Sequence, residues 1–362
     1  MFPSLSVPPV VDLRLSALRR WLSSLDDRHA VDVATLAPAS ADASFRRYFR
    51  VVCSTSAADG ASMATAIVMD APPERENSAA FVHVARLMAD AGLNVPRVLE
   101  QDLDQGFLLL TDLGNRTYLS ALDPAHPQAA ASLMMDAIDA LIAWQCASVP
   151  DVLPPYDDAL LRRELALFPD WYVGKHLGIA LDDKQRATLE AAFDRIVAVN
   201  LAEARTFVHR DFMPRNLMVA SGGVSAGERN PGILDFQDAV HGPISYDVAS
   251  LFKDAFISWD EEVVIDWTVR YWERAKKTGL PVPADFGDFY RDFEWMGLQR
   301  HLKVLGIFAR INYRDGKPYY LSDAPRFIAY VRATANRYRA LGPLLQLLDA
   351  LEGRAVEYGY TF

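Results

Sequence analysis

The sequence predicts an α+β fold of two lobes, in which a small antiparallel sheet precedes a larger, mainly helical part. Three observations predict it. The chain has 362 residues, more than a single hydrophobic core usually fills. Its short β-prone runs are concentrated before residue 113, and helical periodicity prevails after residue 129. We expect a first lobe of residues 1–113 and a second of residues 114–362.

The first lobe is expected to hold a helix followed by strands in the order βββαββ. Leucines at helical spacing, from Leu15 to Leu25, predict a helix over 13–25. The expected strands and their intervening helix cover 33–38, 45–53, 64–69, 77–91 (the helix, ended by Gly92), 98–101 and 107–111. Short strands with polar connections are typical of an antiparallel sheet.

The second lobe is expected to be helical with two short interruptions. From Ala129 an apolar stripe through Leu133, Ile138 and Leu141 is wide enough to bury a helix against others. β-prone segments at 217–220 and 232–234 flank a hairpin-like loop at 221–231. Residues 261–350 return to helical spacing with many aromatic side chains.

Composition limits the partners. The net charge of -10 disfavours broad affinity for nucleic acid or anionic membrane. No apolar run reaches the roughly 18 residues of a membrane span, and residues 1–11 lack a secretory leader pattern. The two cysteines, Cys53 and Cys146, lie far apart and form no metal or disulfide pattern. We expect a cytoplasmic protein with a small-molecule partner and without nucleic acid or membrane binding.

The most informative segment runs from His209-Arg210-Asp211 to Asn216, an H-R-D-x-x-x-x-N pattern. Phosphoryl transfer needs a carboxylate that accepts the proton of the attacking hydroxyl and an oxygen ligand for magnesium nearby. Asp211 supplies the first and Asn216 the second. Pro214 between them favours a tight loop over a continuous helix. The alternative is a polar loop in which these residues meet by chance.

A second motif supports catalysis. The apolar run Gly232-Ile233-Leu234 ends in Asp235, 19 residues after Asn216, at a spacing that suits a β-hairpin. A carboxylate there can bind the magnesium ion that bridges the phosphates, although an Asp at a strand end is more often a turn former. Together the motifs predict an ATP- and Mg²⁺-dependent phosphotransferase with Asp211 as catalytic base and with Asn216 and Asp235 as metal ligands.

With the segment that continues through Gly242-Pro243 to Asp247, the chain resembles the aminoglycoside phosphotransferase-like small-molecule kinases. The resemblance implies a two-lobed protein-kinase-like fold with ATP in the cleft between the lobes. It also implies that Asp247 braces the catalytic loop, whereas by sequence alone Asp247 could equally be a helix N-cap.

Further segments, 44–50, 69–74, 161–171 and 296–303, resemble the branch of this family that acts on amino sugars in bacterial cell-wall recycling. The implied reaction places the γ-phosphate of ATP on the anomeric hydroxyl. The 1-phosphate product would then pass to a nucleotidyltransferase without a stable complex. Trp171, Arg300, His301 and Lys303 are candidates for contact with the sugar; the alternatives are core packing for Trp171 and a solvated turn of helix for the others.

The nucleotide-binding residues are less clear, because no lysine precedes Lys175 and the phosphate-binding lysine of the third strand is therefore missing. The following helix also lacks its usual glutamate partner. We hypothesise that Arg46, Arg47 or Arg50 contacts the phosphates instead, the alternative being that they are solvated strand residues. The resemblance places Ser44 in the turn over the phosphates and Thr111 and Leu113 at the hinge beside adenine.

Two other functions stay open. One is a kinase of another small alcohol, such as an aminoglycoside or a choline-like amine. The other is a catalytically silent nucleotide-binding regulator, which the missing lysine suggests. The retention of Asp211, Asn216 and Asp235 argues against the regulator, because mere binding needs no catalytic base.

Overall fold

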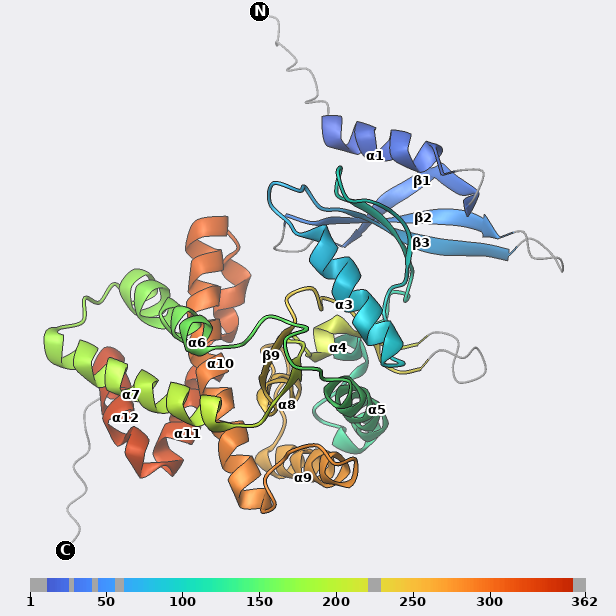
Figure 1. Ribbon diagram of the computed structural model, residues 1–362. Coiled ribbons are helices and arrows are strands. Elements are labelled where there is room, and N and C mark those ends of the chain that lie inside the picture. The colour runs from blue at the N-terminus through green and yellow to red at the C-terminus, as the bar shows by residue number, and fades with distance from the viewer. Residues whose placement is uncertain (1–11, 26–28, 41–44, 56–61, 221–228, 354–362) are drawn as a thin grey trace, which may run out of the picture. The chain divides into compact units, whose positions relative to one another are not determined.

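A computed structural model describes residues 12–25, 29–40, 45–55, 62–220 and 229–353 (Figure 1). Ser44 and most of the predicted loop at 221–231 lie outside these ranges. The chain divides into two compact units. The first comprises Met1–Arg86 with Pro96–Leu113, and the second comprises Leu87–Val95 with Gly114–Phe362.

The first unit is built on an antiparallel five-stranded sheet with strand order β1-β2-β3-β5-β4. The strands are β1 (Val31–Ser40), β2 (Arg47–Thr55), β3 (Ser62–Asp70), β4 (Val98–Asp102) and β5 (Phe107–Thr111), with helix α3 (Ser78–Asp90) between β3 and β4 in the chain. The predicted order of helix and strands is thus confirmed.

Helix α1 (Leu13–Ser23) covers one face of this sheet (Figure 1). Its buried Leu18 and Leu22 form one core cluster with Phe49 and Val51 of β2, which share a face because side chains alternate along a strand. The Asp12 side chain accepts a hydrogen bond from the Leu15 N–H at 2.8 Å and so caps the helix.

The second unit is mainly helical, which confirms the predicted fold class. Its helices are α4 (Tyr118–Ala121), α5 (Pro127–Cys146), α6 (Asp158–Leu165), the π-helix η1 (Phe168–His176), α7 (Asp183–Ala202), α8 (Tyr246–Phe252), α9 (Glu261–Lys277), α10 (Phe286–Asp315), α11 (Ala324–Arg337) and α12 (Gly342–Leu351), with the short 3-10 helices η2 (Pro214–Asn216), η4 (Pro318–Asp323) and η5 (Arg339–Leu341). Helix α10 is buried along most of its length, because α6, α7, α8, α11 and η1 all pack against it (Figure 1). None of the helices in the described ranges is long and apolar enough to cross a membrane.

Two small antiparallel strand pairs hold the two predicted motifs in place. Strand β6 (Arg205–Val208) pairs with β9 (Val240–Pro243), and β7 (Leu217–Met218) pairs with β8 (Gly232–Ile233). The sequence predicted the second pair but not the first. The loop at 209–216 therefore starts from β6 and ends at β7, and the segment at 234–239 connects their partners.

Candidate functional site

The backbone of the second unit is unusual at two positions beside the predicted catalytic residues. Arg210 has φ of 78° and Asp235 has φ of 65°. Such left-handed conformations are uncommon for residues other than glycine and cost on the order of 1–3 kcal/mol each. Among the non-glycine residues of the described ranges, only Ala30 and Asp151 share them. The surrounding contacts must therefore hold this loop in a strained shape.

His209 supplies one such contact from beneath the loop. The ring is fully buried, and Nε2 lies 3.0 Å from the Leu234 carbonyl while Nδ1 lies 3.2 Å from the Asp211 N–H. This pairing requires the neutral tautomer with the proton on Nε2. Burial lowers the pKa of His209 to about 4, in agreement with a neutral ring. His209 thus connects the loop to the segment that carries Asp235.

Asp247 supplies a second contact, from the first turn of α8. Its carboxylate accepts hydrogen bonds from the backbone N–H groups of His209, at 2.6 Å, and Arg210, at 3.0 Å. Burial raises the pKa of Asp247 to about 7, although both backbone donors act in the opposite direction. The N-cap of α8 is Ser245, so Asp247 does not cap that helix and braces the loop as the resemblance implies.

The structure brings Asp211, Asn216 and Asp235 together. Asn216 Nδ2 donates to the Asp211 carbonyl at 2.9 Å and lies 3.3 Å from Asp235 Oδ2. Gln237 Nε2 donates to the other carboxylate oxygen of Asp235 at 2.9 Å. All three predicted residues are partly exposed, whereas the neighbouring Phe236 is buried. The contacts of its NH₂ group fix the orientation of the Asn216 amide and leave Oδ1 as the atom that can serve as an oxygen ligand.

This donor set fits magnesium. Mg²⁺ usually binds through one or two carboxylates together with phosphate oxygens and waters, rather than in a cage made only of protein groups. The carboxylate of Asp235 and Oδ1 of Asn216 match that pattern. Across the described residues no cluster of three or more His, Cys, Asp or Glu side chains could hold a metal by itself.

Arg47, one of the predicted phosphate-binding arginines, lies on the α1 face of β2. Its guanidinium contacts the carboxylates of Asp12 and Asp70, with Nε 2.9 Å from Asp70 Oδ2. Asp70 is completely buried and also pairs with Arg14 at 2.6 Å. These contacts connect the start of α1 to the end of β3.

Arg50 lies on the opposite face of β2 from Arg47, because side chains alternate along a strand, whereas Arg46 directly precedes the strand. Arg46 pairs with Glu76 at 2.7 Å, and Arg50 pairs with Asp112 at 2.6 Å. The helix that follows β3 was predicted to lack an acidic partner for the phosphate-binding residue. Glu76 lies just before α3, so this ion pair was missed. All three candidate arginines are thus engaged by carboxylates of their own unit.

The predicted hinge residues lie at the end of β5, with Thr111 as its last residue and Leu113 two residues further on. Thr111 exchanges hydrogen bonds with Arg97: its N–H donates to the Arg97 carbonyl at 3.0 Å, and its Oγ1 accepts from the Arg97 N–H at 2.9 Å. Leu113 is the last residue of the first unit, before Gly114 with φ of 92°.

The sugar-contact candidates on α10 lie inside the protein. Arg300, His301 and Lys303 are all buried, so the alternative of a solvated turn of helix is wrong. Arg300 donates to the Arg210 carbonyl at 2.8 Å, and Lys303 donates to the Tyr246 hydroxyl at 3.0 Å. Arg300 thus contacts the loop at 209–216 directly, whereas Lys303 reaches α8.

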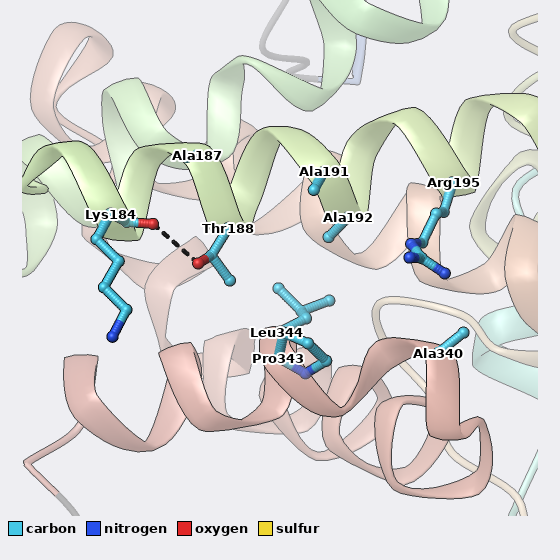
Figure 2. Close-up of a pocket in the computed structure, with 9 residues that line it drawn as sticks. All are labelled: Lys184, Ala187, Thr188, Ala191, Ala192, Arg195, Ala340, Pro343 and Leu344. Atoms are coloured by element: carbon cyan, nitrogen blue, oxygen red, sulfur yellow. Dashed lines mark hydrogen bonds between the residues drawn. The ribbon is translucent and has the colours of Figure 1, made fainter.

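A cavity of about 340 Å³ lies elsewhere in the second unit, between α7 and the η5–α12 segment (Figure 2). Figure 2 shows Ala192 of α7 opposite Leu344 of α12, while the Thr188 hydroxyl donates to the Lys184 carbonyl at 2.8 Å. None of its lining residues belongs to the loop at 209–216 or to the segment at 234–239.

The fold and the motifs together define a kinase-type phosphotransferase whose acceptor is an alcohol group. The chain belongs to the phosphotransferase enzyme family, APH, whose sequence pattern matches residues 35–286.

The curated relatives are similar over almost their whole length. A Pseudomonas aeruginosa protein named N-acetylmuramate/N-acetylglucosamine kinase is 50% identical over 347 residues, which cover 94% of this chain and 97% of that protein. A Neisseria meningitidis protein of the same name is 47% identical, with 95% of this chain and 98% of that protein covered.

Solved structures support the fold. The Plasmodium vivax ethanolamine kinase aligns with a TM-score of 0.60 at 10% identity, covering 90% of this chain and 92% of that one. The ADP-bound aminoglycoside phosphotransferase APH(2'')-Ib aligns with a TM-score of 0.55 at 14% identity, covering 88% and 98%.

Proposed function

We propose that this protein is an ATP- and Mg²⁺-dependent kinase of N-acetylmuramate and N-acetylglucosamine, acting in peptidoglycan recycling and forming the sugar 1-phosphate. The observation that carries the proposal is the full-length similarity, at 46–50% identity, to three proteins that bear this kinase name. The choice of the anomeric hydroxyl rests on the sequence resemblance.

Asp211 is proposed as the base that takes the proton of the sugar hydroxyl at a carboxylate oxygen. It is partly exposed and its backbone is fixed on both sides, by His209 Nδ1 at its N–H and by Asn216 Nδ2 at its carbonyl. Asn216 and Asp235 would hold Mg²⁺, which when bound supplies charge neutralisation on the phosphates. Fixed geometry of this kind lowers the barrier, since the base needs no reorganisation before it reacts.

The first unit is proposed to bind the nucleotide through Ser44, an arginine, and the hinge at Thr111 and Leu113. Of the predicted arginines, Arg46 is a better candidate than Arg47, whose guanidinium is occupied by Asp12 and Asp70 on the α1 face. Arg46 pairs with Glu76 and Arg50 with Asp112, and guanidinium groups also bind phosphate oxygens.

The acceptor is tested by measuring ADP release with ATP and Mg²⁺ in parallel reactions containing N-acetylmuramate, N-acetylglucosamine, kanamycin or choline. Turnover only with the N-acetyl sugars supports the proposal. Phosphorus–proton coupling in the NMR spectrum of the product then identifies the phosphorylated position. Turnover with kanamycin or choline instead would assign another acceptor within the same enzyme class.

The base is tested by Asp211→Asn, which should lower kcat by about 10²- to 10⁴-fold because the proton acceptor is removed. The matched control is Asp183→Asn at an exposed position of α7, which should retain wild-type activity. Nucleotide affinity, measured by titration, should stay within about threefold in both variants, since the base contacts the acceptor. Wild-type turnover by Asp211→Asn would contradict the assignment.

A further inference from the structure

One buried carboxylate outside the catalytic motifs gathers four donors. Glu164, in α6, accepts hydrogen bonds from Arg210 at 2.6 Å, Lys303 at 3.0 Å and Gln299 at 3.1 Å, and also from the Tyr156 hydroxyl. A carboxylate has about four acceptor sites, so this set can satisfy all of them. With 5% of its surface exposed, Glu164 has no direct access to a substrate.

The charge of Glu164 is matched to this environment. Burial alone would raise its pKa, but the neighbouring Lys303 and Arg210 reverse the effect and lower the pKa to about 2. Glu164 is therefore ionised and balances two cations. Replacing it by a neutral group would leave both cations without their carboxylate in a buried site, which is costly.

Glu164 acts on the residue that precedes the proposed base. Arg210 is held at three points: its N–H by Asp247 at 3.0 Å, its carbonyl by Arg300 at 2.8 Å, and its guanidinium by Glu164. Arg300 itself lies over the Tyr246 ring at 4.6 Å. Residues of three helices, α6, α8 and α10, thus fix the strained backbone of Arg210, which directly precedes Asp211.

Close packing of α6 against α10 makes these contacts possible. Helix α6 leads through Leu167 into the π-helix η1, a rare form that is frequent at functional sites. Gly306 of α10 faces the backbone of Leu167 so closely that a Cβ there would overlap it. The missing side chain lets α10 approach, which brings Gln299 and Lys303 within reach of Glu164.

We propose that Glu164 is a positioning residue for phosphoryl transfer, holding Arg210, and through it the Asp211 backbone, in the reactive conformation while balancing the cations behind the base. The inference rests on the proposed kinase function of the same site.

The test is Glu164→Gln, which keeps the shape of the side chain but removes its charge. We expect kcat to fall about 10- to 100-fold, with KM for ATP and sugar within about threefold of wild type. A purely structural role would lower the stability of the fold but leave kcat of the folded enzyme unchanged.

The matched control is Glu190→Gln, at an exposed position of α7, which should leave kcat unchanged. A double-mutant cycle adds Arg210→Gln. If the two residues act as one unit, the double variant should lose no more activity than the worse single variant. Wild-type kcat in folded Glu164→Gln, or fully additive losses in the cycle, would overturn the proposal.

Amide hydrogen exchange separates this inference from the proposed function. The amide hydrogens of residues 210–213 should exchange faster in Glu164→Gln than in Glu190→Gln, whether or not any sugar is phosphorylated. Should Glu164→Gln fail to fold, Arg210→Lys replaces it, since the shorter, non-planar cation cannot reproduce the guanidinium contacts. Unchanged exchange in the variant that folds would refute the positioning role even in an active enzyme.

Discussion

Gly306→Ala should destabilise the second unit, although alanine is normally the better helix former. The added Cβ would lie 2.5 Å from the Leu167 Cβ and closer still to the Leu167 carbonyl carbon and oxygen. Two of these atoms belong to the backbone at the entry to η1 and cannot rotate away. Either α10 or the α6–η1 connection must therefore move.

The magnitude follows from two opposing contributions. Overpacking of a buried site costs about 1–3 kcal/mol, and a backbone overlap belongs at the upper end of that range. Replacing glycine by alanine inside a helix returns up to about 1 kcal/mol. The net loss is therefore about 2 kcal/mol.

Gly297 on the same helix provides a matched control. Its added Cβ would meet only His301 Cε1 at 3.5 Å and Lys253 Cδ at 3.7 Å, which are ordinary van der Waals contacts. Gly297→Ala should therefore be stabilising by up to about 1 kcal/mol. The two variants should differ by about 3 kcal/mol, equivalent to roughly 6–12 °C in Tm for a unit of this size.

Thermal unfolding followed by tryptophan fluorescence measures this difference, because six of the seven tryptophans lie in the second unit. Gly306→Ala should also lower kcat, since Gln299 and Lys303 would be displaced from Glu164. Equal Tm values for the two variants, or a higher value for Gly306→Ala, would refute the reasoning from close packing.

Two further predictions concern the metal site and pH. Asn216→Ala removes a proposed oxygen ligand and should raise the Mg²⁺ concentration for half-maximal activity by about tenfold or more. The measurement is a Mg²⁺ titration of activity at fixed ATP. An unchanged Mg²⁺ requirement would exclude Asn216 as a ligand. Burial raises the pKa of Glu203 from 4.5 to about 8 in the folded state, so its contribution to stability is present below pH 4.5 and is lost as the pH rises through 8. Glu203→Gln keeps an acceptor for the Ser245 N–H, which is 3.1 Å from Glu203 Oε2, but does not titrate. Its Tm relative to wild type should therefore increase between pH 5 and about 8.5, and a constant difference would contradict this.

The sequence predicted the fold well where a local pattern decides the structure. Period-two runs and leucines at helical spacing identified the sheet and α1, and the apolar runs beside the motifs identified β7 and β8. Strands β6 and β9 were missed because each has four residues and their pairing joins Arg205 to Pro243 across a long stretch of chain. The π-helix was also missed, since hydrophobic periodicity does not distinguish one turn type from another over nine residues.

The contacts that support the site could not be predicted for a related reason. The motif spacing identified Asp211, Asn216 and Asp235, which the fold brings together. Glu164 carries no such signal: as a single acidic residue on an amphipathic helix, it looks like a solvated position. Its partners Arg210 and Gln299 are 46 and 135 positions away in the chain, so only the packed structure reveals it.

The contacts that hold the loop at 209–216 argue against the hypothesis that the chain is a catalytically silent nucleotide-binding regulator. That hypothesis rests on the missing lysine, which belongs to the first unit, whereas Glu164, Asp247 and Arg300, which hold the loop at 209–216, belong to the second unit. Loss of the lysine therefore changes a phosphate contact but leaves the proposed base and metal ligands in place. A protein that only bound nucleotide would have no use for backbone strain at both Arg210 and Asp235, or for a buried ion-pair network that maintains it. We infer that the second unit is built for phosphoryl transfer, and that the departure in the first unit concerns how the nucleotide is held.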